Sequence, residues 1–211
     1  MKINEAGLQI IKDAEAGEGI MARWPADHPR WPNRFKYLTA YMCPADVPTI
    51  GWGHTGPDVT ADDVALGTTI SVQKAMQLLA EDLEKFEAGV ERLMTRKPTA
   101  NQFSAFVSLG FNIGLGQDGL AGSTALRRHN KGDTDARVAE AMQWWNKGTV
   151  NGRKQVLSGL VLRRGREASL YMTKDGFSTP KPVGSTPVHE AKPPSVGRLI
   201  VAAASAVTRA A

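Results

Sequence analysis

The chain has 211 residues, of which 42% are hydrophobic and 22% charged, a composition typical of a globular protein. Its formal net charge of +5 favours an anionic partner, and its one cysteine excludes both an internal disulfide and a zinc site built from several cysteines. No spacing typical of metal ligands occurs, so we expect no metal ion and no cofactor.

The first predicted element is an amphipathic helix near the N-terminus. Leu8, Ile11 and Glu15 recur at helical spacing, which places Glu15 in the last turn. Residues Met1 to Ala6 lead directly into this pattern without the apolar core of an export signal. We therefore expect a chain that folds in the cytoplasm, with no signal peptide and no transmembrane segment.

Residues 17–37 have a high density of proline. They contain Arg23-Trp24-Pro25 and, seven residues later, Arg30-Trp31-Pro32. Proline at this frequency excludes a regular helix or a central strand, so we expect an irregular segment here.

Residues 40–55 predict a short antiparallel β segment. Tyr41, Val47, Ile50 and Trp52 favour strands, and the stretch from Pro44 to Asp46 favours a turn. Gly51 and Gly53 leave one face low enough for a ligand to approach. The reactive or hydrogen-bonding side chains among these small residues are Cys43, Thr49 and His54. The pattern is that of a polymer-binding cleft with chemistry at its floor.

The rest of the chain up to about residue 172 is predicted to be largely helical. Ser71 can cap a long helix with an apolar stripe from Val72 to Leu93, and Thr99 to Gln102 has the form of a capping box. Further helices are expected over 123–132, from 133 or 134 to 145, and over 158–172. Residues 174–197 read as a linker, and 199–207 as an alanine-rich stretch too short to span a bilayer. We therefore expect a folded domain over 1–173 and a disordered tail over 174–211.

Five ordered segments resemble the phage-type lysozymes, glycoside hydrolase family 24, which are muralytic endolysins. They are Ala6 to Glu15, the run Ala40 to Thr55 with its Thr49-Ile50-Gly51-Trp52-Gly53-His54, Asn101-Gln102-Phe103, Phe111 to Gly114 with Gly122-Ser123-Thr124, and Gly159 to Glu167. The resemblance implies an α+β fold in which a long helix joins a small β lobe to a larger helical lobe. It also implies hydrolysis of the β-1,4 bond between N-acetylmuramic acid and N-acetylglucosamine in peptidoglycan.

The resemblance also assigns catalytic roles in a Glu/Cys/Thr variant of the family site. Glycoside cleavage needs a proton donor for the leaving oxygen, and Glu15 takes that position, with Glu18 as a rival. Cys43 stands where many relatives carry aspartate, and its thiolate would stabilise positive charge or activate water. Alternatively, Cys43 is a small buried residue without a catalytic role, and Asp46 supplies the carboxylate instead. Thr49 would orient the attacking water.

Substrate-binding and structural roles follow from the same resemblance. Asn112 would bind an N-acetyl group or simply end its helix, and Arg164, or Arg163 beside it, would approach Glu15. Relative to the family, residues 17–37 contain an insertion, where Trp24 and Trp31 either stack on sugar rings or belong to a strap packed on the nearest apolar surface. His54 is expected to be structural and to pair with Asp82 on the long helix.

The sequence is also compatible with two other functions. A lytic transglycosylase needs no second carboxylate and forms a 1,6-anhydro product, whereas a basic wall-binding or nucleic-acid-binding module would not depend on Glu15 at all. For the endolysin we expect peptidoglycan strands as the partner, no nucleic acid, and a monomer. The resemblance implies that a holin releases the protein from the host cytoplasm to the cell wall.

Overall fold

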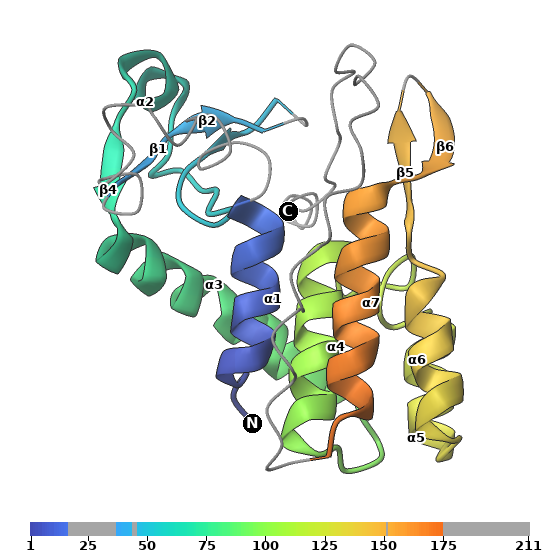
Figure 1. Cartoon of the computed structure of the whole chain (residues 1–211). Helices are drawn as coiled ribbons and strands as arrows, with labels where there is room; N and C mark the ends of the chain where they lie inside the picture. Colours follow the sequence, from blue (N-terminus) through green and yellow to red (C-terminus); the bar gives the residue numbers. More distant parts are fainter. Residues whose placement is uncertain (17–36, 44–45, 151, 175–211) are drawn as a thin grey trace, which may run out of the picture.

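The computed structural model describes residues 1–16, 37–43, 46–150 and 152–174. These residues form a small β lobe and a larger helical lobe, with the long helix α3 between them (Figure 1). The predicted α+β fold is therefore confirmed. The predictions for Glu18, Trp24, Trp31 and the segment 175–211 lie outside the described residues. Within the described ranges, every helix is too short or too polar to cross a membrane.

Helix α1, Glu5–Ala16, belongs to the helical lobe although it comes first in the chain. Its buried residues Ile10 and Ile11 join the main hydrophobic core, and the helix packs on α4 and α7. Gly7 permits this close packing, because a Cβ atom there would lie 2.8 Å from the Cβ of Ser104 on α4. The C-terminal end of α1, which carries Glu15, points toward the β lobe (Figure 1).

The β lobe consists of two short antiparallel pairs and one short helix. Strand β1, Tyr37–Thr39, pairs with β4, Thr69–Ser71, and β2, Tyr41–Met42, pairs with β3, Pro48–Thr49. Helix α2, Ala61–Leu66, begins with a capping box between Thr60 and Asp63. The lobe has its own small core, to which α3 contributes Leu78, and which otherwise contains Ala40, Ile50 and Val59.

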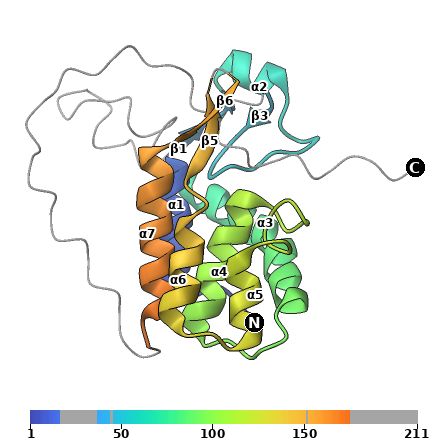
Figure 2. The same ribbon diagram turned by 90° about the vertical axis from the view of Figure 1, so that its right-hand side faces the viewer.

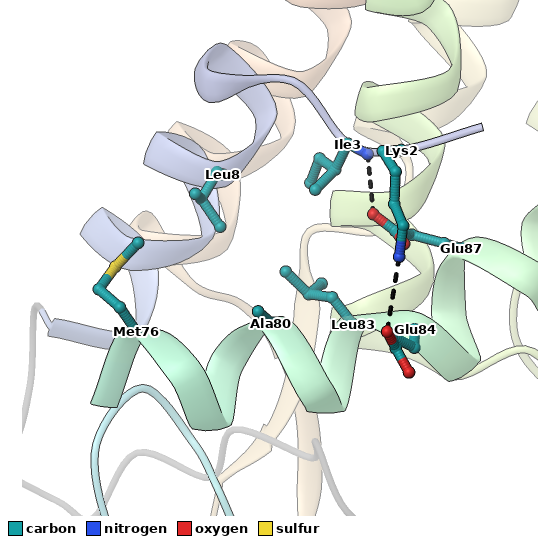
Figure 3. Close-up of a pocket in the computed structure, with 8 residues that line it drawn as sticks. All are labelled: Lys2, Ile3, Leu8, Met76, Ala80, Leu83, Glu84 and Glu87. Carbon is teal, nitrogen blue, oxygen red and sulfur yellow. Dashed lines mark hydrogen bonds and ion pairs between the residues drawn. The ribbon is translucent and has the colours of Figure 1, made fainter. Parts of the chain in front are cut away.

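Helix α3, Val72–Leu93, begins beside the β lobe and ends within the helical lobe, as its apolar stripe predicts (Figure 1). The Ser71 hydroxyl caps it by accepting a hydrogen bond from the Lys74 backbone at 3.1 Å. The N-terminal segment crosses this helix: the buried Glu87 carboxylate accepts the Ile3 N–H at 2.8 Å and pairs with Lys2 at 2.9 Å. A pocket of about 270 Å³ between α1 and α3 lies beside these contacts (Figure 3).

Helix α4, Ala100–Ile113, forms the centre of the helical lobe, and nearly all of its side chains are buried. It packs against α1, α3 and α7, Ser158–Met172. Helices α5, Thr124–Lys131, and α6, Asp135–Gln143, complete the lobe, with α6 against both α5 and α7 (Figure 2). These helices agree with the predicted ones to within a few residues.

A β-hairpin that the sequence analysis does not predict connects α6 to α7. Strand β5, Lys147–Val150, pairs with β6, Arg153–Val156, and the Leu157 N–H closes its base by bonding to the Asn146 carbonyl at 3.0 Å. The hairpin and the β lobe stand at the same end of the helical lobe (Figure 1).

Candidate active site

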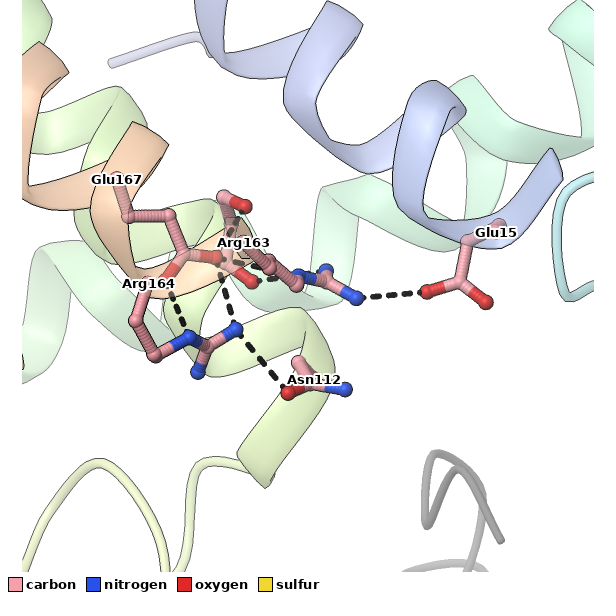
Figure 4. A network of polar contacts seen from close by, with 6 residues as sticks. Glu15, Asn112, Arg163, Arg164 and Glu167 are labelled. Carbon is pink, nitrogen blue, oxygen red and sulfur yellow. Dashed lines mark hydrogen bonds and ion pairs between the residues drawn. The ribbon is translucent and has the colours of Figure 1, made fainter. Parts of the chain in front are cut away.

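Glu15 lies at the end of α1, where the helical lobe meets the β lobe. Its side chain is only 9% exposed, and its Oε1 accepts a hydrogen bond from Arg163 Nη1 at 2.9 Å (Figure 4). The contact joins the first helix to the last one. Because the guanidinium binds one carboxylate oxygen and not both, Oε2 is left on the side that faces the β lobe.

The β lobe reaches this second oxygen through Gly53. A Cβ atom built on Gly53 would lie 3.6 Å from Glu15 Oε2, so the backbone of the Gly51-Trp52-Gly53 turn borders the carboxylate. Gly53 has a φ of 87°, which side-chain-bearing residues rarely adopt. Glycine is thus needed at position 53 for two reasons: the positive φ of the backbone and the closeness of Glu15.

Arg163 is fixed by several further contacts. Its side chain is 3% exposed, its Nε donates to Glu167 Oε1 at 3.2 Å, and its Nη2 donates to the Ser108 carbonyl at 3.2 Å. The Ser108 hydroxyl in turn donates to Glu167 at 2.7 Å. The guanidinium that holds Glu15 is therefore itself held by two further acceptors.

Arg164 does not take the position expected of it. Its side chain is fully buried, donating to Glu167 Oε1 at 3.0 Å and to Asn112 Oδ1 at 3.1 Å (Figure 4). The buried side chain of Arg164 presents no exposed group to a substrate, and the neighbour considered beside it, Arg163, is the arginine that contacts Glu15. Burial lowers the pKa of Arg164 to about 10, against the opposing effect of Glu167, so the group remains charged at neutral pH.

Asn112 belongs to the same buried network. It is 6% exposed, and its amide oxygen accepts from Arg164. This contact uses one of the two lone pairs of the amide oxygen, and the NH2 donors have no partner among the described residues.

The second wall of the site comes from strands β2 and β3. Tyr41 is directly opposite Thr49, and Cys43 follows Tyr41 by two residues, so the three side chains share one face. Thr49 is 2% exposed and its hydroxyl donates to the Val47 carbonyl at 3.0 Å, which leaves the oxygen lone pairs free to accept from a water. Cys43 is a free, half-buried thiol.

Tyr41, which the sequence pattern marks only as a strand residue, is affected electrostatically by both Glu15 and Cys43. Burial raises the pKa of Tyr41, and the nearby charges of Glu15 and then Cys43 raise it further. The phenol therefore lies within electrostatic reach of both proposed catalytic groups. Its place in the Ala-Tyr segment, two residues before Cys43, is the sequence signal that could have identified it.

His54 lies at the edge of the β lobe and contacts α3. Its Nδ1 is 3.0 Å from Asp82 Oδ2, the contact that the sequence analysis expects, and its Nε2 is 3.2 Å from Asp58 Oδ2. Burial lowers the pKa of His54, but hydrogen bonding and attraction from Asp82, then Asp58, outweigh it and raise the pKa overall. The pair attaches the β lobe to the long helix.

Within the described part of the chain, no group of three or more His, Cys, Asp or Glu side chains is arranged to hold a metal ion. The chemical groups gathered at the junction of the lobes are a carboxylate bound to a guanidinium, a thiol, a threonine hydroxyl and a phenol. A carboxylate held by one oxygen at the junction of two lobes is suited to acid-catalysed cleavage of a polymer.

Comparisons with known proteins identify the family of this chain. The family model for phage lysozyme matches residues 36–167. The endolysin of Salmonella phage P22 is 39% identical over 136 residues, which are 64% of this chain and 87% of that protein. This chain belongs to the phage lysozyme family.

Other relatives of this phage lysozyme cover more of the chain. The endolysin of Acyrthosiphon pisum secondary endosymbiont phage 1 is 36% identical over 81% of this chain and 98% of its own length. The solved endolysin of Escherichia coli O157:H7 phage FAHEc1 superposes with a TM-score of 0.65 at 37% identity, over 82% of this chain and 94% of that one. The chain spans 55% of the endolysin of Bacillus phage B103, at 34% identity.

Proposed function

We propose that the protein is an endolysin that hydrolyses the β-1,4 bond between N-acetylmuramic acid and N-acetylglucosamine in peptidoglycan. The observation that carries this proposal is the position of Glu15 at the lobe junction, with Oε1 bound to Arg163 and Oε2 directed toward the β lobe. Membership of the phage lysozyme family, among relatives named endolysins, supports the same activity.

Glu15 Oε2 is the proton donor of the proposed mechanism. As the bond between the anomeric carbon and the leaving oxygen breaks, the leaving oxygen takes the Oε2 proton, and positive charge develops at the anomeric carbon. Arg163 stabilises the resulting Glu15 carboxylate through Oε1. Because Arg163 binds Oε1 alone, it fixes the carboxyl group and leaves Oε2 free to donate its proton.

Thr49 and Cys43 act from the opposite side. The Thr49 hydroxyl already donates to Val47, so it can only accept from the attacking water and thereby sets the orientation of that water. Cys43, as a thiolate, takes a proton from the water as it adds to the anomeric carbon. The enzyme returns to its starting state when the proton gained by Cys43 passes through solvent to Glu15, so the net change is one water added across the cleaved bond.

The direct test replaces Glu15 by glutamine. Glu15→Gln keeps the shape and the contact with Arg163 but cannot donate a proton, and we expect kcat for release of reducing ends from purified peptidoglycan to fall by roughly 10²–10⁴-fold. Glu5→Gln, the same change on an exposed residue of the same helix, serves as the control and should keep parental activity. Wild-type rates in Glu15→Gln would refute the assignment and direct attention to Glu18.

A lytic transglycosylase is the second candidate, because Cys43 replaces the carboxylate that many relatives carry. The two reactions differ in product mass. Hydrolysis adds one water per bond cleaved, whereas transglycosylation leaves a 1,6-anhydro terminus and adds none. We expect the hydrolytic mass, and incorporation of ¹⁸O from labelled water at the new reducing end.

The cellular setting is part of the proposal. In this setting the muramidase remains in the host cytoplasm until a holin releases it to the wall, where it acts as a monomer on glycan strands. A non-catalytic binding module is the competing view, and undiminished wall clearing by Glu15→Gln would favour it.

A further inference from the structure

The hairpin β5–β6 carries a group of exposed cations at the active-site end of the molecule. Lys147, Arg153 and Lys154 are all solvent-exposed. None of them forms an ion pair with any other residue in the described ranges, whereas Arg128, Arg163, Arg164 and Arg166 nearby in sequence all do. The hairpin therefore presents positive charge that the described part of the protein does not neutralise.

The strand register places the two lysines on the same face. Lys147 is opposite Val156 and Thr149 is opposite Lys154, so Lys147 and Lys154 are diagonal neighbours on one face of the hairpin. All four residues of that face are exposed. Every residue of β6 is exposed as well, so packing of the core does not explain why the hairpin is present.

The hairpin is also physically continuous with the catalytic network. It leads through the buried Leu157 directly into α7, and Arg163 lies five residues beyond the first residue of that helix. At the rise of an α-helix, this is a separation of roughly 7.5 Å along the axis. The hairpin and the β lobe stand on either side of the adjoining ends of α1 and α7 (Figure 1).

We propose that the exposed face of the hairpin, with Lys147 and Lys154, is a subsite that binds the free carboxylates of peptidoglycan stem peptides. The proposal rests on the proposed function, because it takes the glycan strand to lie at Glu15. Stem peptides branch from the strand at the muramic acid residues and carry free carboxylates, so they bring anionic groups to the sides of a strand held there. Lysine ammonium groups on a two-stranded arm suit such mobile anions, because each can rotate to follow its partner.

The test compares native and neutralised substrate. Soluble peptidoglycan fragments are treated with a carbodiimide and glycinamide, which convert the free carboxylates into neutral amides and leave the glycan intact. We expect Lys147→Gln/Lys154→Gln to raise KM on the native fragments about three- to tenfold with kcat unchanged. The wild type on amidated fragments should show the same KM as the double variant, and the double variant should not distinguish the two substrates.

A charge-matched control separates a local effect from loss of net charge. Lys97→Gln/Lys131→Gln also removes two exposed lysines. Lys131 is the last residue of α5 and precedes the start of α6, whereas the hairpin follows the other end of α6. An equal rise in KM for this control would overturn the proposal. So would an unchanged KM for Lys147→Gln/Lys154→Gln, or a double variant that still responds to amidation as the wild type does.

A binding measurement keeps the subsite testable apart from the reaction. Co-sedimentation of the Glu15→Gln protein with native and amidated wall sacculi should show weaker binding to the amidated ones, and addition of Lys147→Gln/Lys154→Gln should abolish this difference. Binding that ignores amidation overturns the subsite even if hydrolysis is observed. Absence of new reducing ends from wild-type enzyme would refute the proposed function instead, whatever the binding shows.

Discussion

Arg163 shares one guanidinium between the proposed acid and a buried structural carboxylate. It bonds to Glu15, to Glu167 and to the Ser108 carbonyl, and its side chain is almost completely buried. Two arginines, Arg163 and Arg164, balance the two carboxylates Glu15 and Glu167. A change at Arg163 should therefore affect folding as well as catalysis, since it leaves carboxylates in a poorly hydrated site without a full set of partners.

We expect Arg163→Gln to lower the free energy of unfolding by about 3–5 kcal/mol, the range for breaking a buried pair by removing one partner. In a Glu15→Gln background the same change should cost less, by about 1–3 kcal/mol, because one of the stranded charges is already gone. Urea unfolding of the wild type, the two single variants and the double variant gives this coupling energy directly.

Arg166→Gln on the same helix is the control for this cycle. Arg166 pairs with Asp13 at 2.7 Å, but both side chains are about 40% exposed, so its loss should cost no more than about 1 kcal/mol. A coupling energy near zero between positions 15 and 163 would show that the contact contributes nothing to stability.

The choice between Arg163 and Arg164 marks the limit of prediction at the scale of residues. Adjacent residues on a helix point about 100° apart, so the sequence pattern places an arginine near Glu15 without deciding which one. The decision depends on the rotation of α7 against α4, which brings Ser108 and Asn112 to different arginines. Glu167 follows Arg164 by three residues and Arg163 by four, so the sequence predicts that it can pair with both. The sequence does not predict which of the two arginines also binds Glu15.

At the scale of elements, His54 connects the turn after β3 to α3, and its raised pKa makes this connection depend on pH. A histidine whose pKa is raised on folding contributes stability that is fully present below its unfolded pKa of about 6.5. The contribution disappears as pH rises through the higher pKa of the folded state.

We therefore expect His54→Asn to lower Tm by about 2–4 °C near pH 5.5, corresponding to roughly 1 kcal/mol for a partly solvated pair, and by much less at pH 9. Asp58→Asn should have a smaller effect with the same trend, because the Asp58 side chain is 63% exposed. Equal losses of Tm at both pH values would mean that packing, and not charge, accounts for the role of His54.

The elements differ in how well sequence predicts them, for physical reasons. Helix α3 has a continuous apolar stripe and a serine cap, and its bounds follow from both. The β5–β6 hairpin buries neither face fully, so it lacks the alternation of apolar and polar residues that marks a strand. Its one local signal was the Asn151-Gly152 dipeptide, which favours a hairpin turn. Helix α2 was not predicted either, and its local signal was the capping box formed by Thr60 and Asp63.

At the scale of the whole molecule, the helical lobe depends on both ends of the described chain. Helix α7 packs against α1, α4 and α6, and the Asn101 side chain bonds to the carbonyls of Thr173 and Lys174 that follow it. We propose that the folded domain ends here, as expected for residues 1–173.

A chain ending after Lys174 should accordingly unfold in one cooperative transition and keep wild-type kcat on peptidoglycan fragments. A chain ending after Leu157 should show no cooperative transition, because it lacks the core residues Leu170 and Tyr171, exposes the side chains that they cover, and leaves Glu15 without Arg163. Circular dichroism during heating and a reducing-end assay check both. An inactive or unfolded chain after removal of 175–211 would place the boundary of the domain further along.

The ion pair between the opening and closing helices also governs when the enzyme can work. Glu15 leaves the ribosome early, and its partner follows 148 residues later. At ordinary rates of translation this delay is on the order of ten seconds, and throughout it the nascent polypeptide has no assembled acid. The site can therefore assemble only after Arg163 has been made, and copies that terminate before that residue should never hydrolyse peptidoglycan.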